Sequence, residues 1–343
     1  MKIGAVDLFC GIGGLTYGLR KAGIDVVAGV DLDNSCKYAF ETNNHSKFIQ
    51  KSVDDVTGVE IKELLKPYDV KILVGCAPCQ PFSNHRKDKK DRKSHKDWSL
   101  LYQFSRIIKE SNPDVVSMEN VPALKKEKVF YDFVKGLEEL GYTVSHSVVN
   151  TSDFGMAQSR RRLILLAAKN KKIELMKDAD TIQKTVKEII GDLPEVAAGE
   201  VFAGDRLHQS SKLNDINLKR IRASKPNGSW RDWPKKLVVP CHKKASGKSY
   251  SSVYGRMGWD GVSPTITTQF TGYGTGRFGH PEQDRALTLR EGALLQSFPP
   301  KYAFISKNEP LVMKNIARHI GNAVPPLLGE AIGKSILMHL EVD

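Results

Sequence analysis

The chain has 343 residues, of which 40% are hydrophobic and 27% charged, with a net charge of +13 and a sequence pI near 9.4. This length suggests about two domains of ordinary size. The composition argues against intrinsic disorder. No apolar run approaches the roughly 18 residues of a membrane span, and the first residues lack the apolar stretch of a signal peptide. We therefore expect a cytoplasmic protein with no membrane association and a polyanionic partner.

The first 168 residues alternate strand-like apolar runs with helical patterns. Strands are expected at 2–7, 25–31, 70–75, 113–119, 142–149 and 162–168, and helices near 14–22, 34–43, 58–66, 98–111 and 126–140. This alternation predicts βαβ units in a parallel, doubly wound α/β sheet that binds ligands at the carboxyl ends of its strands. Helices are also expected at 171–190, 288–296 and 326–341, whereas 195–285 lacks long periodic segments and predicts a second, irregular domain.

The positive charge is concentrated in two segments. Residues 206–256 hold 13 Lys and Arg against two acidic residues, and residues 84–97 hold seven against three, while the rest of the chain is slightly acidic. A solvated surface would spread the excess evenly, whereas clustered Lys and Arg are typical of nucleic-acid binding. Both segments are therefore candidate contacts with a nucleic acid.

A glycine-rich turn follows the first expected strand, in the run from Asp7 to Leu15. Backbone N–H groups in such a turn can approach a ligand closely. The dinucleotide pattern G-x-G-x-x-G is not met, because Thr16 stands at its last position. Asp31 ends the second strand, where a carboxylate can accept hydrogen bonds from ribose hydroxyls, and Asp55 could reach an adenine amino group. A nucleoside cofactor is favoured over a tight turn with capping acids.

Cys79 follows the strand at 70–75, stands between two prolines and precedes the basic segment 84–97. Cationic surroundings lower the pKa of a thiol, and the thiolate is the nucleophile. Cys76 and Cys79 also form a CxxC pattern, which leaves a redox pair open. A zinc site is weakly supported, because only Cys241 with its neighbouring histidine could complete it. A small buried structural cysteine is the other alternative.

Charged residues adjoin two further strands. Glu119 ends the strand at 113–119, where a carboxyl beside a thiolate can serve as an acid or a hydrogen-bonding group. Arg160 and Arg162 stand at the start of the last strand, where they would share one face and could grip a phosphate, a carboxylate or a base edge. A helix-capping carboxylate and a surface basic cluster are the alternatives.

Taken in order, these runs closely resemble the motifs of the C5-cytosine DNA methyltransferases of bacterial restriction–modification type. The resemblance covers essentially the whole chain and rests on DLFCGIGGL at 7–15, PCQPFS at 78–83, ENV at 119–121, QSRRR at 158–162, RALTLREGALLQSFP at 285–299 and GNAVPP at 321–326. It implies the Rossmann-like fold of S-adenosylmethionine-dependent methyltransferases. Residues 1–190 and 314–343 would form the catalytic and cofactor-binding domain, and 191–313 a smaller, irregular target-recognition domain.

The resemblance implies a role for each matching residue. Cys79 would add to C6 of cytosine, Glu119 would hold N3 and the exocyclic amine, and Arg160 and Arg162 would orient the base and its flanking phosphate. The residues expected to bind S-adenosyl-L-methionine are Phe9, Gly11, Ile12, Gly14, Asp31, Leu32, Asp55, Val56, Pro78, Leu100 and Asn322. Those expected to contact DNA are Gln80, Ser83, Arg86, Lys87, Lys235, Lys236, Gln269 and Arg277. No metal is expected.

The family often has Glu where this chain has Asp31 and an aromatic residue where it has Leu32. The implied partner is double-stranded DNA, from which the target cytosine is flipped, with the segment 84–97 closing over it. The resemblance also implies a protein of the bacterial cytoplasm or nucleoid, with a cognate restriction endonuclease acting separately. A monomer is expected, because a flipped base in an asymmetric cleft needs one copy of the chain. Because GNAVPP lies far along the chain, the last helix is expected to fold back onto the first domain.

Three other functions are weighed against this one. An RNA cytosine-5 methyltransferase is the nearest, but the roughly ninety-residue insert favours duplex DNA. A DNA-binding regulator on an inactive scaffold is disfavoured by the retention of Cys79, Glu119, Arg160 and Arg162. A nicotinamide or flavin oxidoreductase is disfavoured by the missing third glycine and by the presence of the ENV run.

Overall fold

A seven-stranded sheet organises the computed structural model, which describes residues 1–78, 97–169, 171–178 and 180–341. The strand order is β3-β2-β1-β4-β5-β7-β6. The strands are β1 (Ile3–Leu8), β2 (Asp25–Asp31), β3 (Lys47–Gln50), β4 (Val70–Gly75), β5 (Val115–Asn120), β6 (Thr143–Asn150) and β7 (Arg161–Ala168). All except β3 were predicted from the apolar runs. The four residues of β3 are too few to give a periodic signal in the sequence.

The expectation of a wholly parallel sheet is wrong for β7. The pairs among β1 to β5 are parallel, but β7 runs antiparallel to both β5 and β6. Only residues 151–160 connect β6 to β7, and a parallel crossover needs a dozen residues or more. The amino end of β7 therefore lies at the sheet edge where the carboxyl ends of β1, β2, β4 and β5 also lie.

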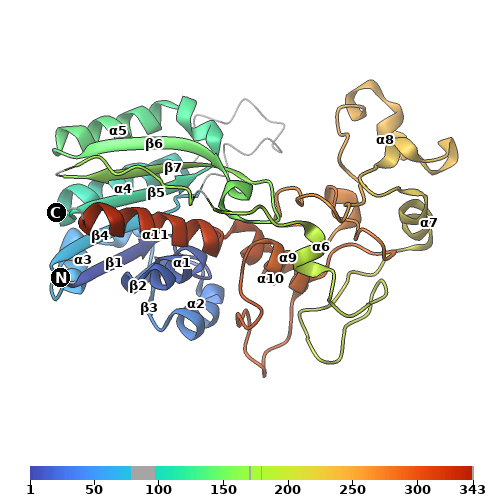
Figure 1. The fold of residues 1–343 in the computed structure, drawn as a ribbon, viewed down its shortest axis with the longest axis horizontal. Coiled ribbons are helices and arrows are strands. Elements are labelled where there is room, and N and C mark those ends of the chain that lie inside the picture. The colour runs from blue at the N-terminus through green and yellow to red at the C-terminus, as the bar shows by residue number, and fades with distance from the viewer. Residues whose placement is uncertain (79–96, 170, 179, 342–343) are drawn as a thin grey trace.

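Helices cover both faces of the sheet, as a doubly wound fold requires (Figure 1). The helices of the first half are α1 (Gly14–Ala22), α2 (Lys37–Asn44), α3 (Gly58–Leu65), α4 (Asp97–Ser111) and α5 (Lys128–Glu139). Apolar side chains of α3, α4 and α5 pack with Leu73 and Val116 on one face. Those of α1 pack on the other face with Ile72 and Val74. The α/β fold class is confirmed.

The last helix, α11 (Pro326–Glu341), completes the second face by packing along α1. A glycine makes this possible, since a Cβ at Gly18 would lie 2.3 Å from the Pro326 carbonyl oxygen. Figure 1 shows α11 running along the sheet beside α1. The expectation that the end of the chain folds back onto the first domain is confirmed.

The helix expected at 171–190 is wrong for most of its length. The helix there, α6, spans only Val186–Ile190, and the Thr185 and Glu188 side chains form a capping box at its start. Ile173 and Leu175 stand two residues apart and pack against the sheet core. That spacing suits an extended segment, not a helix.

The part of the chain beyond α6 contains short elements joined by long irregular segments. Its helices are α7 (Asp215–Ala223), α8 (Pro240–Lys243), α9 (Leu289–Leu295) and α10 (Met313–Asn322). Trp230, Trp233 and Tyr273 belong to an apolar cluster of this part alone, and Figure 1 shows α7 and α8 at the end of the molecule far from β1. Among the helices described, none is long and apolar enough to cross a membrane.

Candidate functional site

The carboxyl ends of β4 and β5 place Cys76 beside Glu119. The two strands pair with Gly75 opposite Met118, so the next residues, Cys76 after β4 and Glu119 within β5, are neighbours. The Asn120 amide donates a hydrogen bond to the Ala77 carbonyl oxygen at 3.1 Å, which fixes the start of the loop after β4. That loop leads into Pro78, which is exposed. Five expected site residues lie outside the described residues: Cys79, Gln80, Ser83, Arg86 and Lys87.

Glu119 is a buried carboxylate, only 3% exposed, at the centre of this edge. Its Oε1 lies 2.7 Å from Nε of Arg162, and its Oε2 accepts a hydrogen bond from the Cys76 thiol at 2.8 Å. The antiparallel direction of β7 makes the ion pair possible, because Glu119 pairs with Ile164 and Arg162 lies two residues nearer the amino end of β7. A buried charge needs such partners.

Arg160 and Arg162 make different contacts, and their sharing of one strand face stays a prediction. β7 begins at Arg161, and Arg160 lies buried just before it. Its guanidinium donates hydrogen bonds to the carbonyl oxygens of Ile266, Gly321 and Ala323, at 3.0, 3.1 and 3.4 Å respectively. Arg160 therefore joins two distant chain segments to the start of β7.

The glycine-rich turn and Asp31 meet at the ends of β1 and β2. Oδ2 of Asp31 accepts a hydrogen bond from the Gly11 N–H at 2.8 Å, and Oδ1 accepts one from the Asp33 N–H at 2.9 Å. Burial raises the pKa of Asp31. Gly11 has a positive φ of 52°, and a Cβ there would meet nothing within 4 Å. The turn thus leaves open space beside backbone that is held by a carboxylate.

The other residues expected to bind the cofactor differ in how far they are exposed to solvent. Leu32 is 69% exposed, and Asp55 and Asn322 are exposed as well, whereas Phe9 and Leu100 are half-buried. The side chains of Ile12 and Val56 are in the apolar cores, so only their backbones are available to a ligand. Gly14 lies against GNAVPP, since a Cβ there would be 2.2 Å from the Val324 carbonyl oxygen.

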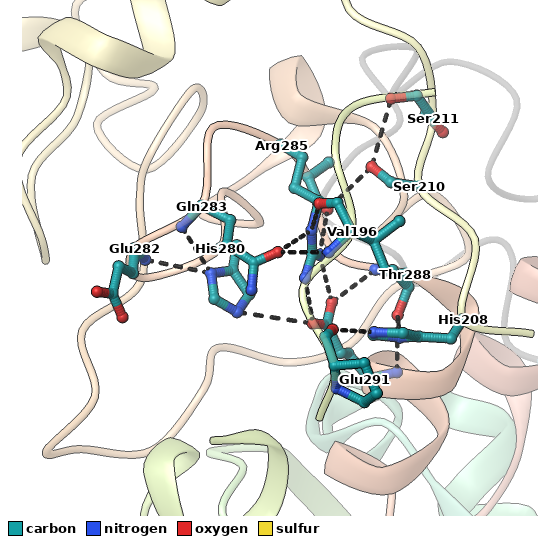
Figure 2. Close-up of polar contacts among 12 residues, drawn as sticks. Val196, His208, Ser210, Ser211, His280, Glu282, Gln283, Arg285, Thr288 and Glu291 are labelled. Atoms are coloured by element: carbon teal, nitrogen blue, oxygen red, sulfur yellow. Dashed lines mark hydrogen bonds and ion pairs between the residues drawn. The ribbon is translucent and has the colours of Figure 1, made fainter. Parts of the chain in front are cut away.

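The segment RALTLREGALLQSFP builds a buried polar cluster around α9 (Figure 2). Arg285 and Glu291 are 1% and 0% exposed and form a two-pronged ion pair at 2.7 and 2.8 Å. Glu291 also accepts a hydrogen bond from the Thr288 N–H, and Nε of Arg285 donates one to the Val196 carbonyl oxygen. Burial lowers the pKa of His280, beside this pair, to about 4. The cluster ties residues near 196 to those at 280–291.

The residues beyond α6 that are expected to contact DNA differ in how exposed they are. Lys235 and Lys236 are exposed in the short 3-10 turn Lys235–Leu237, and Gln269 is exposed. Arg277 is partly exposed, and its Nε atom is buried with no hydrogen-bond partner among the described residues.

Asp33, Cys36 and His319 bring three atoms able to bind a metal within 4.8 Å of one another. The Asp33 carboxylate is already paired with the Arg318 guanidinium at 2.8 Å. Burial raises the pKa of the Cys36 thiol. The expectation that no metal is required stays a prediction.

Asp7 was missed as a charged neighbour of the site. It is fully buried in β1, accepts a hydrogen bond from the Thr16 hydroxyl at 2.7 Å, and faces the charge of Asp31. Burial is the main reason that the pKa of Asp7 rises to about 7. The available signal was an aspartate inside an otherwise apolar strand, four residues before Gly11, the first glycine of the turn.

Asp7→Asn is expected to stabilise the protein increasingly as the pH rises. Because the pKa of Asp7 is raised from 3.8 to about 7 on folding, its protonated form supports the fold below pH 4, and that support is lost as the pH rises to about 7. Between about pH 5 and about pH 8, this titration lowers the free energy of unfolding of the intact protein by about 2 kcal/mol. The variant has no carboxyl at this position and does not show the decrease. Urea unfolding of both proteins at the two pH values measures the change. A difference between them that stays constant with pH would contradict the prediction.

The doubly wound sheet, with a glycine-rich turn after β1 and an acidic residue at the end of β2, has the Rossmann-like fold of S-adenosylmethionine-dependent methyltransferases. Comparison with known proteins then identifies the family. The family model for C-5 cytosine-specific DNA methylase matches residues 3–338, so the chain belongs to that family and is a DNA (cytosine-5)-methyltransferase. The family predicted from the sequence motifs is confirmed, and the oxidoreductase alternative is excluded.

Individual relatives agree with this assignment. Type II methylase M.HgiDII of Herpetosiphon aurantiacus is 53% identical over 345 residues, which cover 99% of this chain and 96% of that protein. Type II methyltransferase M1.BsuMI of Bacillus subtilis (strain 168) is 32% identical over 353 residues, covering 95% and 78% respectively. The solved structure of the Entamoeba histolytica methyltransferase EhMeth shares the fold, with a TM-score of 0.71 at 16% identity and 99% of each chain covered.

Proposed function

We propose that the protein transfers a methyl group from S-adenosyl-L-methionine to C5 of a cytosine within a specific duplex DNA sequence. The observation that carries the proposal is the buried Glu119 carboxylate, placed by Arg162 and Cys76 at the edge where the PCQ run begins. Such a carboxylate can hold the N3 and amino edge of cytosine, which presents hydrogen-bond donors when N3 is protonated.

The cofactor would lie over the ends of β1 and β2. Bound S-adenosyl-L-methionine supplies an electrophilic methyl group on its sulfonium. The Asp31 carboxylate would accept hydrogen bonds from the ribose, and the exposed Leu32 side chain would cover the adenine, with Asp55 near its amino group. The open space beside Gly11 fits a ligand that approaches the backbone closely.

The chemistry uses covalent catalysis, which divides one hard step into easier ones. The Cys79 thiolate adds to C6 of cytosine while Glu119 holds N3, and the ring becomes an enamine whose C5 is nucleophilic. After C5 has accepted the methyl group from the sulfonium, which leaves as S-adenosyl-L-homocysteine, loss of the C5 proton to water restores the C5–C6 double bond and expels the thiolate. The target atom is inaccessible inside a duplex, so the nucleotide is flipped into the site at a cost of a few kcal/mol. Arg162 supports Glu119, and Arg160 positions the neighbouring backbone.

The segment 191–313 would serve as the DNA-recognition domain, with 1–190 and 314–343 as the catalytic domain. Support comes from the exposed Lys235 and Lys236 within the basic stretch and from an apolar cluster of its own around Trp230 and Trp233. Gln269 and Arg277 would contact DNA from the same part of the chain. The segment 84–97, whose residues 84–96 lie outside the described part of the chain, would close over the flipped base.

Substituting Lys235 and Lys236 by alanine is expected to flatten the salt dependence of DNA binding. Each lost phosphate contact lowers the slope of log K against log salt concentration by about one unit. The slope is measured by fluorescence anisotropy with a labelled duplex over a range of salt concentrations. Alanine at Lys128 and Lys135, which are exposed on α5, is the matched control. An unchanged slope in the Lys235 and Lys236 variant would show that these lysines face solvent.

Methyl transfer from labelled S-adenosyl-L-methionine to duplex DNA tests the proposed function directly. We expect transfer to DNA of mixed sequence and none to tRNA. Transfer to tRNA alone would favour the RNA enzyme, and no transfer to any DNA would favour an inactive, DNA-binding scaffold. Bisulfite sequencing of DNA from an expressing bacterial host would then give the methylated site.

The biological setting is proposed from the named relatives. The chain would be the modification arm of a restriction–modification or related defence system, since two similar proteins are Type II enzymes. It would act in the bacterial cytoplasm or nucleoid, as a monomer, with a cognate restriction endonuclease working separately. A single asymmetric site around one flipped base requires one copy of the chain.

A further inference from the structure

Cys76, the first cysteine of the CxxC pattern, lies beside the proposed cytosine site and has no role in the reaction described above. Its side chain is partly exposed, and its Sγ atom lies 2.8 Å from Oε2 of Glu119. Arg162 contacts the other carboxylate oxygen, Oε1, at 2.7 Å. The carboxylate is thus held from two sides, by a thiol that directly follows β4 and a guanidinium that belongs to β7.

The backbone around Cys76 is fixed, so the thiol has a defined position. The Cys76 N–H donates a hydrogen bond to the Leu8 carbonyl oxygen at 3.3 Å, which ties it to β1. The next residue, Ala77, accepts a hydrogen bond from the Asn120 side chain at 3.1 Å, which ties it to β5. Because the backbone on either side of the thiol is already held in place, the thiol can orient its acceptor with little further loss of conformational entropy.

We propose that Cys76 is a positioning residue, whose thiol holds the Glu119 carboxylate in the orientation that receives cytosine. A carboxylate has two oxygens and about four lone-pair positions. Cys76 and Arg162 each take one position on a different oxygen, and both oxygens keep a position for the base. With Cys76 absent, the carboxylate rotates about its terminal torsion, which is broad and poorly restrained in glutamate. The inference rests on the proposed function of Glu119.

Cys76→Ala is expected to lower kcat about tenfold, the equivalent of about 1.4 kcal/mol in the barrier, with KM for DNA and for the cofactor within twofold of the intact protein. Cys76→Ser is expected to recover most of the rate, because a hydroxyl also donates to a carboxylate. Cys241→Ala removes an exposed thiol elsewhere and serves as the control. A kcat within twofold for Cys76→Ala would overturn the inference, as would equal loss in the alanine and serine variants.

A double-mutant cycle with Glu119→Gln separates positioning from a general structural effect. If Cys76 acts through Glu119, adding Cys76→Ala to Glu119→Gln changes kcat by less than twofold. If the two losses multiply, Cys76 does not act through Glu119 and the inference is wrong.

A spectroscopic measurement keeps this inference distinct from the proposed function. The S–H stretching band of Cys76, isolated as the infrared difference between the intact protein and Cys76→Ala, is expected to shift in Glu119→Gln. That shift requires no turnover. An intact protein that methylates no DNA would refute the proposed function alone, whereas an unshifted band would refute the contact between Cys76 and Glu119 in an active enzyme.

Discussion

Cys79→Ala is expected to abolish methyl transfer to DNA, with a loss of a thousandfold or more, while binding of DNA and S-adenosyl-L-methionine is retained. In covalent catalysis the nucleophile creates the reactive form of the substrate, so its removal costs on the order of 10³-fold or more. Here C5 of cytosine stays unreactive until C6 is attacked. Single-turnover transfer of labelled methyl to duplex DNA measures the loss, and calorimetric titration with S-adenosyl-L-methionine measures binding.

The matched control is Cys241→Ala, which removes an exposed thiol from the basic stretch and is expected to keep full activity. DNA carrying 5-fluorocytosine supplies an independent readout. Because fluorine at C5 cannot leave as a proton does, the intact protein should form a covalent adduct and Cys79→Ala should form none. Methyl transfer that survives in Cys79→Ala would contradict covalent attack by Cys79. This conclusion would not depend on the results of the Cys76 variants.

Glu291→Gln is expected to destabilise the folded protein by about 3 kcal/mol, because it leaves the buried guanidinium of Arg285 without its counter-charge. Both side chains are almost wholly inaccessible to water and are joined at 2.7 and 2.8 Å. Although burial raises the pKa of Glu291, hydrogen bonds and charge from Arg285 bring it below its usual value. The carboxylate is therefore ionised at neutral pH. Urea denaturation followed by tryptophan fluorescence reports the change.

Glu139→Gln makes the same chemical change in an exposed ion pair with Lys135 and should alter stability by less than about 0.5 kcal/mol. Combining Arg285→Met with Glu291→Gln should restore part of the loss, since the unpaired buried charge is then gone. Equal effects of Glu291→Gln and Glu139→Gln would mean that the cluster in Figure 2 does not hold residues near 196 to α9.

The sequence predicts local structure well where side chains repeat with a clear period. Six of the described strands and most helices of the first half follow directly from apolar runs. The direction of β7 was missed, although the short connection after β6 already made a parallel crossover impractical. The extended segment around Ile173 was missed, although its apolar residues Ile173 and Leu175 stand two apart, a spacing that suits a strand and not a helix.

The site is harder to predict, because its partners are distant in the chain. The pairing of Glu119 with Arg162 depends on the register of β5 against β7, which no local pattern encodes. Arg160 bonds to carbonyl oxygens more than a hundred residues away, so its burial could not be foreseen. Asp31 was easier to predict as a site residue, because an acidic residue at the end of a strand is itself a local signal in the sequence.

The contact between α1 and α11 bears on how the protein matures. The residues that cover one face of the sheet, such as Leu19 and Ile332, are separated by most of the chain. Contacts of such long range form slowly, because a large loop must close first. While the chain is being synthesised, that face stays partly uncovered until α11 has emerged from the ribosome. The glycine-rich turn meets Val324 only then, so the capacity to modify DNA would be acquired after synthesis of the rest of the fold.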